Sequence, residues 1–271
     1  MTICNDLRQA VLQAAMQGKL TEQLDTDSSV DELLVVAESA SQIEGQRVKQ
    51  KEITAIKEDD ISFDIPQNWR WVKLGTVCTI ARGGSPRPIK SYLTTKEDGI
   101  NWIKIGDTDK NGKYIYSTQE KIIPEGVKKS RMVYSGDFLL TNSMSFGRPY
   151  ILKIDGCIHD GWLVISQPNE IFIPDFLYWL LSSNVAYSQF ADKVSGAVVK
   201  NLNSDKVANS VFPLPPIEEQ RRIVYKVEEL MAKIDELEKT EQTLESIKSA
   251  FPDDMKAAIL QAAMQGKLTE Q

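Results

Sequence analysis

The chain is 271 residues long, and 42% of its residues are hydrophobic, 26% charged and 8% aromatic. This is the composition of a soluble globular protein of one or two domains, and it excludes a largely disordered, collagen-like or wholly coiled-coil chain. No window approaches about 18 consecutive apolar residues and no secretory signal opens the chain, so we expect a cytoplasmic protein without a membrane span. Cys4, Cys78 and Cys157 are odd in number and far apart, which predicts reduced thiols and neither disulfides nor a zinc site.

The net charge of −6 by itself argues against a nucleic-acid partner. The charge is unevenly placed, however: residues 61–215 hold 18 Lys and Arg against 14 Asp and Glu, so a basic centre lies between acidic flanks. Because phosphate contacts depend on the local potential, this centre can still present an anion-binding face. A solvated surface with chance asymmetry explains the same numbers.

A repeat marks the two ends of the chain. Residues 8–23 read RQAVLQAAMQGKLTEQ and residues 256–271 read KAAILQAAMQGKLTEQ, with three differences. Both copies are rich in helix formers, follow a pair suited to N-capping (Asn5-Asp6, Asp253-Asp254) and reach a glycine suited to C-capping (Gly18, Gly266). We therefore expect a short helix at each end, and the wide spacing indicates the joints of a large duplicated unit rather than a solenoid.

Between the repeats, the composition and the expected secondary structure change twice. Residues 24–60 are acidic and predict a connector with a helix over about 30–50. Residues 61–216 predict a mixed α+β domain of short strands and tight turns, with a hairpin turn at 110–113 and a helical patch at 174–190. This domain closes at the proline-rich sequence FPLPPIEEQ.

Residues 217–251 predict one long helix that Pro252 ends, followed by the C-terminal repeat helix over 252–271. In the helix over 217–251, apolar residues recur at spacings of four and three, which is a heptad pattern that forms one seam: Ile223, Val227, Leu230, Ile234, Leu237 and Leu244. We expect this seam to dimerise with a second chain, and packing on its own domain is the alternative. The predicted fold class is therefore α+β, with one globular mixed α/β domain and long helices in an antiparallel coiled coil that a second copy completes.

The sequence lacks the motifs of several enzyme classes. It has no GxxxxGK[ST] and no GxGxxG after a strand. His159 is the only histidine, so a His-based metal cluster is excluded, and we expect it to be a turn or core residue. The Asp/Asn-Pro-Pro-aromatic motif of amino-methyltransferases is also absent. We expect no catalytic residue, no metal and no cofactor on this chain.

Four strings carry a resemblance: WRWVKLG (69–75), GGSPRP (83–88), INWIKIGD (100–107) and PLPPIEEQRRIV (213–224). Their order and spacing, with the terminal repeats, resemble the DNA specificity (S) subunit of type I restriction-modification systems over nearly the whole chain. S subunits of that family carry two target recognition domains, each followed by a long helix, whereas this sequence has one of each and resembles a half-subunit. The resemblance implies a non-catalytic DNA-binding protein that assembles with methyltransferase (M) and restriction (R) subunits, which carry the S-adenosylmethionine and ATP sites.

With one recognition domain per chain, the resemblance implies a homodimer with antiparallel helices and a gapped palindromic target. A helix over residues 217–250 spans roughly 50 Å, more than one DNA turn of about 34 Å. Base readout is expected from polar loops, because Arg suits guanine and Asn suits adenine: Arg82, Ser85, Arg87, Asn142, Ser143 and Arg148. Phosphate contacts are expected from Lys90, Tyr92, Lys128, Lys129, Arg131, Lys200 and Asn201.

The repeats are expected to dock M through Leu12, Met16, Leu260 and Met264. Alternatively, the two terminal helices pack against one another. Three other functions stay open at this point: a coiled-coil scaffold without DNA readout, an autonomous DNA enzyme, and an inactive or regulatory truncation.

Overall fold

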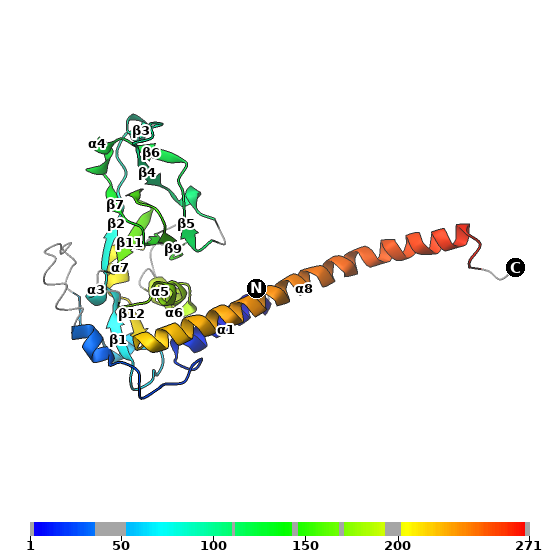
Figure 1. The fold of residues 1–271 in the computed structure, drawn as a ribbon, viewed down its shortest axis with the longest axis horizontal. Helices are drawn as coiled ribbons and strands as arrows, with labels where there is room; N and C mark the ends of the chain where they lie inside the picture. Colours follow the sequence, from blue (N-terminus) through cyan, green and yellow to red (C-terminus); the bar gives the residue numbers. More distant parts are fainter. Residues whose placement is uncertain are drawn as a thin grey trace.

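The computed structural model describes residues 3–35, 53–109, 112–142, 146–167, 171–192 and 202–268. Figure 1 shows a strand-rich body, a group of helices at its base, and one long helix that leaves the base and runs far beyond it. The mixed α+β fold class predicted from the sequence is confirmed.

The body contains two five-stranded sheets. Among the described residues, the first has the order β3-β6-β4-β10-β7, with β3 Leu93–Thr94, β6 Glu120–Ile122, β4 Ile100–Ile103, β10 Gly156–Ile158 and β7 Arg131–Val133. The second has the order β2-β11-β8-β9-β5, with β2 Thr79–Arg82, β11 Trp162–Ser166, β8 Phe138–Thr141, β9 Pro149–Leu152 and β5 Tyr114–Ile115. Short helices α3 (Leu74–Val77) and α4 (Pro124–Val127) connect strands, and α7 (Ser204–Ala208) leads into the last strand, β12.

The second sheet is buried on both faces, because the helices cover one face and the first sheet covers the other. Alternate side chains of each strand point to opposite faces. In β8, Phe138 and Leu140 belong to the core that the sheet shares with the helices, whereas Leu139 belongs to the core between the sheets. The continuous apolar runs of the central strands follow from this double burial.

A two-stranded ribbon closes the body at its base. β1 (Arg70–Lys73) pairs antiparallel with β12 (Val211–Leu214), so the first and last strands of the body lie side by side. The residues after β12 then start the long helix: Glu219 accepts a hydrogen bond from Trp69 Nε1 at 2.7 Å, and the Gln220 amide donates to the carbonyls of Ile171 and Pro215. The polar end of PLPPIEEQ is therefore a buried junction between body and helix.

The base is helical. α1 (Ile3–Met16), α5 (Pro174–Leu181) and α6 (Asn184–Asp192) pack together, and α1 and α5 also pack against the N-terminal half of α8 (Ile217–Met264). They share one core with the second sheet.

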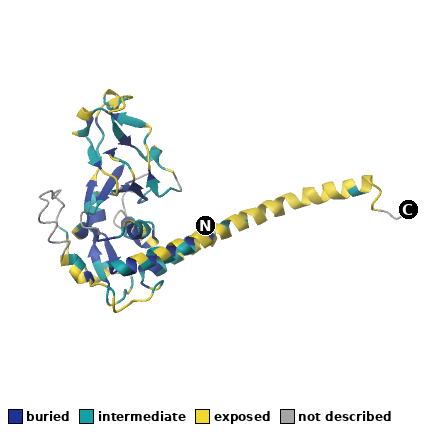
Figure 2. Ribbon diagram, in the orientation of Figure 1, coloured by how far each residue is buried: buried dark blue, intermediate teal, exposed yellow. Residues whose placement is uncertain are grey.

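The remainder of α8 is exposed (Figure 2). Its last buried residue is Ile234, and all residues from 242 to 261 are exposed. We call residues 242–268 the arm. The predicted end at Pro252 is wrong, because α8 continues through this proline to Met264. Proline removes one helical hydrogen bond but does not prevent the flanking turns from continuing.

Two local predictions are also wrong. Asn5-Asp6 and Asp253-Asp254 lie inside helices rather than at N-caps, although Gly18 and Gly266 do have the positive φ of a helix C-terminus. The segment 110–113 joins β4 and β5, which lie in different sheets, so it is not a hairpin turn; residues 110 and 111 are outside the described residues. The connector is helical over 30–35, and its remainder up to residue 52 is outside them as well.

In the described residues, no helix is long and apolar enough to cross a membrane. Among these described residues, no three or more His, Cys, Asp or Glu side chains come together in a group that could hold a metal ion.

Candidate nucleic-acid interface

Asp160 organises the polar loops at one side of the body. It lies in the turn between β10 and β11. Its carboxylate accepts a hydrogen bond from Ser85 Oγ at 2.8 Å and lies 3.7 Å from the Arg87 guanidinium, and its carbonyl accepts from Arg82 Nε at 3.1 Å. Arg131 joins the group, because its Nε donates to the Arg82 carbonyl at 2.8 Å. Ser85 and Arg87 thus meet at the carboxylate of Asp160, a residue that the sequence did not single out, while Arg82 contacts its carbonyl and Arg131 reaches the turn only through Arg82.

The loop approaches this turn closely because residue 83 is glycine. A Cβ at Gly83 would lie 2.2 Å from the His159 carbonyl oxygen, which no side chain tolerates. The Gly83 and Gly84 amides donate to the carbonyls of Trp162 and Ile158. The GGSPRP string therefore serves to hold Ser85 and Arg87 over the β10–β11 turn.

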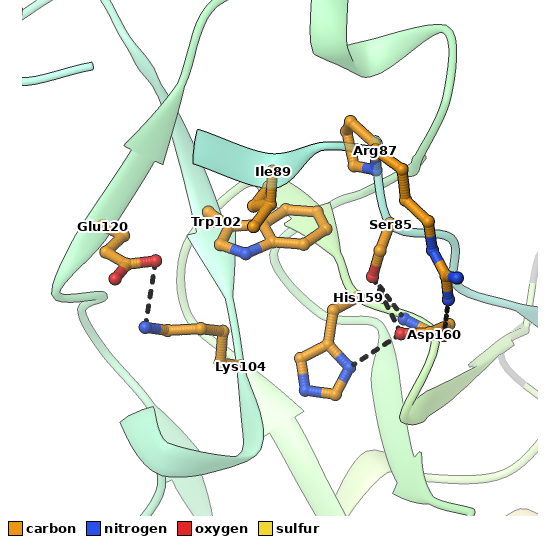
Figure 3. Close-up of a pocket in the computed structure, with 9 residues that line it drawn as sticks. Ser85, Arg87, Ile89, Trp102, Lys104, Glu120, His159 and Asp160 are labelled. Carbon is orange, nitrogen blue, oxygen red and sulfur yellow. Dashed lines mark hydrogen bonds and ion pairs between the residues drawn. The ribbon is translucent and has the colours of Figure 1, made fainter. Parts of the chain in front are cut away.

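A cleft of about 360 Å³ opens beside this cluster (Figure 3). Its lining residues are Ser85, Pro86, Arg87, Ile89, Trp102, Lys104, Glu120, His159 and Asp160. One wall is aromatic and aliphatic, with Trp102 below Ile89, and the opposite wall carries Asp160 and the Arg87 guanidinium. Lys104 pairs with Glu120 at 3.0 Å at its far side. The cleft thus combines apolar surface with hydrogen-bonding groups of both signs.

The charge states of the turn follow from its contacts. The hydrogen bond from Ser85 is the main cause that lowers the pKa of Asp160, so this group is a carboxylate at neutral pH. Burial lowers the pKa of His159, against the opposing influence of Asp160 and Asp107. His159 Nδ1 and Nε2 lie within hydrogen-bond distance of the Gly161 and Ile105 amides, at 2.6 and 3.3 Å. The prediction that His159 is a turn residue agrees with this placement.

The predicted phosphate-contacting residues surround the same loops. Lys129 Nζ is 2.5 Å from the Tyr92 hydroxyl and 5.0 Å from the centre of its ring. Lys90 and Lys128 are exposed. These four side chains come from the segment before β3 and from the α4–β7 connection, and they form a basic rim that we call the Lys129 rim.

Two predicted base readers are placed differently. Asn142 is only 3% exposed, and its amide donates to the Asp160 carbonyl at 2.8 Å. Direct base readout by Asn142 is therefore wrong for this structure, because its amide is buried against the turn that it supports. Arg148 lies over the Tyr150 ring and lines a second cleft between α1, α5 and α8, away from Asp160. Ser143, Lys200 and Asn201 are outside the described residues.

Sequence reasoning missed Asp160, Trp102 and Lys104. Asp160 follows the single histidine in a polar turn between two apolar strands, and this position is the one signal that the sequence offers for it. Trp102 is 2% exposed and reads as an ordinary core residue until the cleft beside it is seen.

The predicted dimerisation seam is divided by burial. Ile223, Val227 and Ile234 are buried in the core of this same chain, together with side chains of α1 and α5. Their prediction as a surface open to a second chain is wrong for this structure, because the base of the body covers them. Leu230 is half-buried, whereas Leu237 and Leu244 are exposed.

The predicted M-docking residues divide in the same way. Leu12 and Met16 are buried in α1, so they are not a docking surface in this structure. Leu260 is 65% exposed and Met264 is 89% exposed, both on the arm. The alternative that the two terminal helices pack against one another is also wrong, because α1 packs on the inner part of α8 and the C-terminal copy lies at its far end (Figure 1).

The chain resembles known proteins over nearly its whole length. It is 29% identical over 274 residues to the type I restriction enzyme EcoBI specificity subunit of Escherichia coli, covering 99% of this chain and 51% of that protein. It is 26% identical over 272 residues to the EcoDI specificity subunit of the same species, covering 99% of this chain and 55% of that one. The chain therefore spans about half the length of these curated relatives.

The fold has a solved counterpart. The HsdS subunit from Thermoanaerobacter tengcongensis superposes with a TM-score of 0.54 at 20% identity, covering 98% of this chain and 57% of that one. A chain from a study of type I R-M system assembly and conformational transition gives a TM-score of 0.56 at 21% identity, with 98% and 56% coverage. In the sequence, residues 66–248 match the family described as "Type I restriction modification DNA specificity domain". This chain therefore belongs to the type I restriction-modification DNA specificity family.

Proposed function

We propose that this chain selects the DNA site for a type I restriction-modification complex, with the body on the DNA and α8 as a spacer. Membership of the family makes it a DNA specificity protein without catalytic activity or a cofactor of its own. S-adenosylmethionine and ATP are then bound by the methyltransferase and restriction subunits that it directs. The residues in contact with DNA and the arrangement of copies are the finer parts of this proposal.

The observation that carries the DNA-contacting face is the cluster around Asp160. Arg87 is 83% exposed at its side chain, yet Asp160 lies within ion-pair distance of it. A guanidinium that is both oriented and exposed can form the paired hydrogen bonds by which Arg reads the major-groove edge of guanine. The Lys129 rim lies on neighbouring loops and supplies the cationic groups that phosphate contacts need.

The arrangement of two copies is supported by the exposed part of α8. Leu237, Leu244 and Phe251 recur every seven residues along α8, and their side chains are 40%, 49% and 59% exposed. Apolar residues in such a series stabilise a helix pair when a second helix covers them. We propose that a second copy does so in the antiparallel direction, as a homodimer with a two-fold axis across the arm.

This arrangement sets the expected target. The 48 residues of α8 extend about 72 Å at 1.5 Å per residue, so two bodies at opposite ends of the pair reach separate DNA segments. Because the two bodies are identical and related by a two-fold axis, the site they select is a gapped palindrome.

The test is a methylome. The chain is expressed with its cognate M subunit in a host without adenine methylation, and modified adenines are mapped by single-molecule sequencing. A symmetric gapped motif is expected. An asymmetric gapped motif would contradict the homodimer while leaving DNA selection intact, and no new methylation from soluble subunits would favour a scaffold or an inactive truncation.

A further inference from the structure

The two copies of the terminal repeat have opposite environments. In α1, Leu12, Ala15, Met16 and the following Gly18 are buried. Their counterparts on the arm are Leu260, Ala263, Met264 and Gly266, which are all exposed. The arm thus carries, in solvent, an identical counterpart of each buried residue of the first copy of the repeat.

The site that holds α1, which we call the α1 seat, also has polar contacts. Arg8 Nη2 lies 2.7 Å from Asp235 and 2.7 Å from Glu238, and Gln23 Nε2 donates to Glu219 at 2.8 Å. Thr21 Oγ1 donates to the same carboxylate at 3.1 Å. The polar residues are repeated on the other copy as Lys256, Thr269 and Gln271, of which the last two are outside the described residues.

In the seat, α1 runs in the same direction as the α8 helix of a second chain would run in an antiparallel pair. From Cys4 beside Glu241 to Gln23 beside Glu219, α1 runs antiparallel to α8. A second α8 in the proposed antiparallel pair runs in the same direction as α1, with its C-terminal copy toward the base of the first chain. Its Lys256 would face Asp235 and Glu238 if the two-fold axis lay halfway between these positions, near Ser246.

We propose that, in a pair of these chains, the C-terminal copy of the repeat from each chain occupies the α1 seat of the other and displaces α1. The inference rests on the proposed homodimer and adds what joins it. Such an exchange is a low-cost route to a dimer, because the contacts made with the second chain replace nearly identical contacts within the first.

The three differences between the copies set the balance. The Gln9 side chain accepts a hydrogen bond from the backbone N–H of Asn184 at 3.0 Å, and its counterpart Ala257 has no side-chain acceptor for this bond. Arg8 contacts both carboxylates through Nη2 and reaches Asn5 Oδ1 through Nη1, whereas Lys256 offers a single ammonium group. Val11 is replaced by Ile259. Since α1 makes better polar contacts and is tethered to its seat, it holds the seat in dilute protein, and exchange requires concentration.

Cys4 reports on the occupant of the seat. It is fully buried in α1, with its Sγ 3.4 Å from Glu241, and its counterpart on the arm is Pro252, which has no thiol. Release of α1 therefore exposes a cysteine that the incoming helix does not replace. Cys78 and Cys157 are buried in the body, away from α1, and serve as internal controls.

The test measures maleimide labelling of each cysteine by mass spectrometry across a protein dilution series, with the oligomeric state measured by light scattering. Labelling of Cys4 is expected to rise with the dimer fraction, while Cys78 and Cys157 stay protected. The double variant Lys256→Arg/Ala257→Gln restores the α1 contacts and is expected to shift both curves to concentrations at least threefold lower. Lys239→Arg, on the exposed part of α8, is the matched control and leaves the curves unchanged.

A second double variant removes the apolar surface of the C-terminal repeat, whose side chains are exposed in the single chain, and a variant at another exposed position of α8 is its control. Leu260→Asp/Met264→Asp is expected to abolish dimer formation and the labelling of Cys4, whereas Tyr225→Asp, at a position 74% exposed on α8, leaves both unchanged. A dimer in which Cys4 stays protected would overturn the exchange and leave the homodimer standing. A chain that is monomeric at every concentration would overturn the homodimer itself, and Cys4 labelling that is independent of concentration would show that α1 leaves its seat without a second chain.

Discussion

The inner part of α8 and the arm are two regions of one helix with contrasting surroundings. Around residues 219–234, α8 is covered by α1, α5 and the ribbon, and it presents buried carboxamide and carboxylate groups as well as apolar side chains. Along the arm the same kind of amphipathic sequence lies in solvent. The difference teaches that helix propensity and apolar pattern form the helix in both regions, while burial depends on whether the rest of the chain supplies a surface to cover it.

The two copies of the terminal repeat show the same contrast between buried and exposed surroundings in nearly identical sequences. Leu12 and Leu260 occupy the same place in the same local sequence, yet Leu12 is 2% exposed and Leu260 is 65% exposed. Substitutions at matched positions therefore test tertiary context with the local sequence held constant.

Leu12→Ala should have the largest effect. Removal of a buried leucine side chain leaves a cavity, so the free energy of unfolding is expected to fall by about 2–5 kcal/mol. Leu260→Ala in dilute protein should change it by less than about 0.5 kcal/mol, because its side chain contacts little in the monomer. Urea unfolding of both variants measures the difference, and equal losses would contradict the contrast between the two copies.

Glu219→Gln tests the polar junction of the inner region. The carboxylate accepts from Trp69, Thr21 and Gln23, and such charge-assisted hydrogen bonds contribute about 1.5–3 kcal/mol. A loss of about 2 kcal/mol is expected by urea unfolding. The matched control on the arm is Glu245→Gln, which loses only an exposed pair with Lys248 and should cost less than about 0.5 kcal/mol. A comparable cost in the control would show that the arm is packed in solution.

Arg87→Ala sharpens the contrast from the side of the body. The guanidinium is exposed, so thermal stability should stay within experimental error, whereas DNA discrimination at one symmetric pair of base positions should fall by about 1–3 kcal/mol. Lys128→Ala should instead weaken binding to all sequences and lower the salt dependence by about one counterion. Binding assays on matched and single-mismatch duplexes over a salt series distinguish the two, and sequence-independent losses from both variants would refute this division of roles.

The smallest effect concerns pH. Because the pKa of Asp160 is lower in the folded chain, its interactions stabilise the fold above the unfolded-state pKa of about 3.9, and this contribution is lost as the pH falls through the folded-state pKa. The side chain is 44% exposed, so the contribution at neutral pH is expected to be less than about 1 kcal/mol. The free energies of unfolding of the native chain and of Asp160→Asn should differ at pH 7 and converge once the pH falls below the folded-state pKa of Asp160; a difference that persists under fully protonating conditions would assign the effect to packing.

Much of the organisation was predictable from local sequence. The repeat, the glycines that end it, the basic centre and the seven-residue series of α8 all follow from patterns within a few turns or strands. The loop residues Arg82, Ser85 and Arg87 around GGSPRP lie together at the Asp160 turn, and their role in base readout stays a prediction.

The failures were of one kind. Ile223 and Leu244 belong to one heptad series, and no local pattern says that the base of the body covers the first and not the second. Asn142 was predicted to read bases because polar residues surround it in the sequence, but its side-chain amide donates a hydrogen bond to the carbonyl of Asp160, 18 residues later in the chain. Asp160 itself was overlooked because its partners come from a strand and loop about 75 residues earlier in the chain.

The amino-acid sequence by itself determined the succession of helical and strand-rich regions, the basic character of the central domain and the family of the chain, because these depend on short-range periodicity, composition and motif order. Only the tertiary structure decided which of two equal helices is buried, which carboxylate organises the loops, and how much of α8 remains available to a second chain. The physical reason is that burial and hydrogen-bond satisfaction are properties of pairs of surfaces, and the second surface of each pair comes from a distant part of the chain.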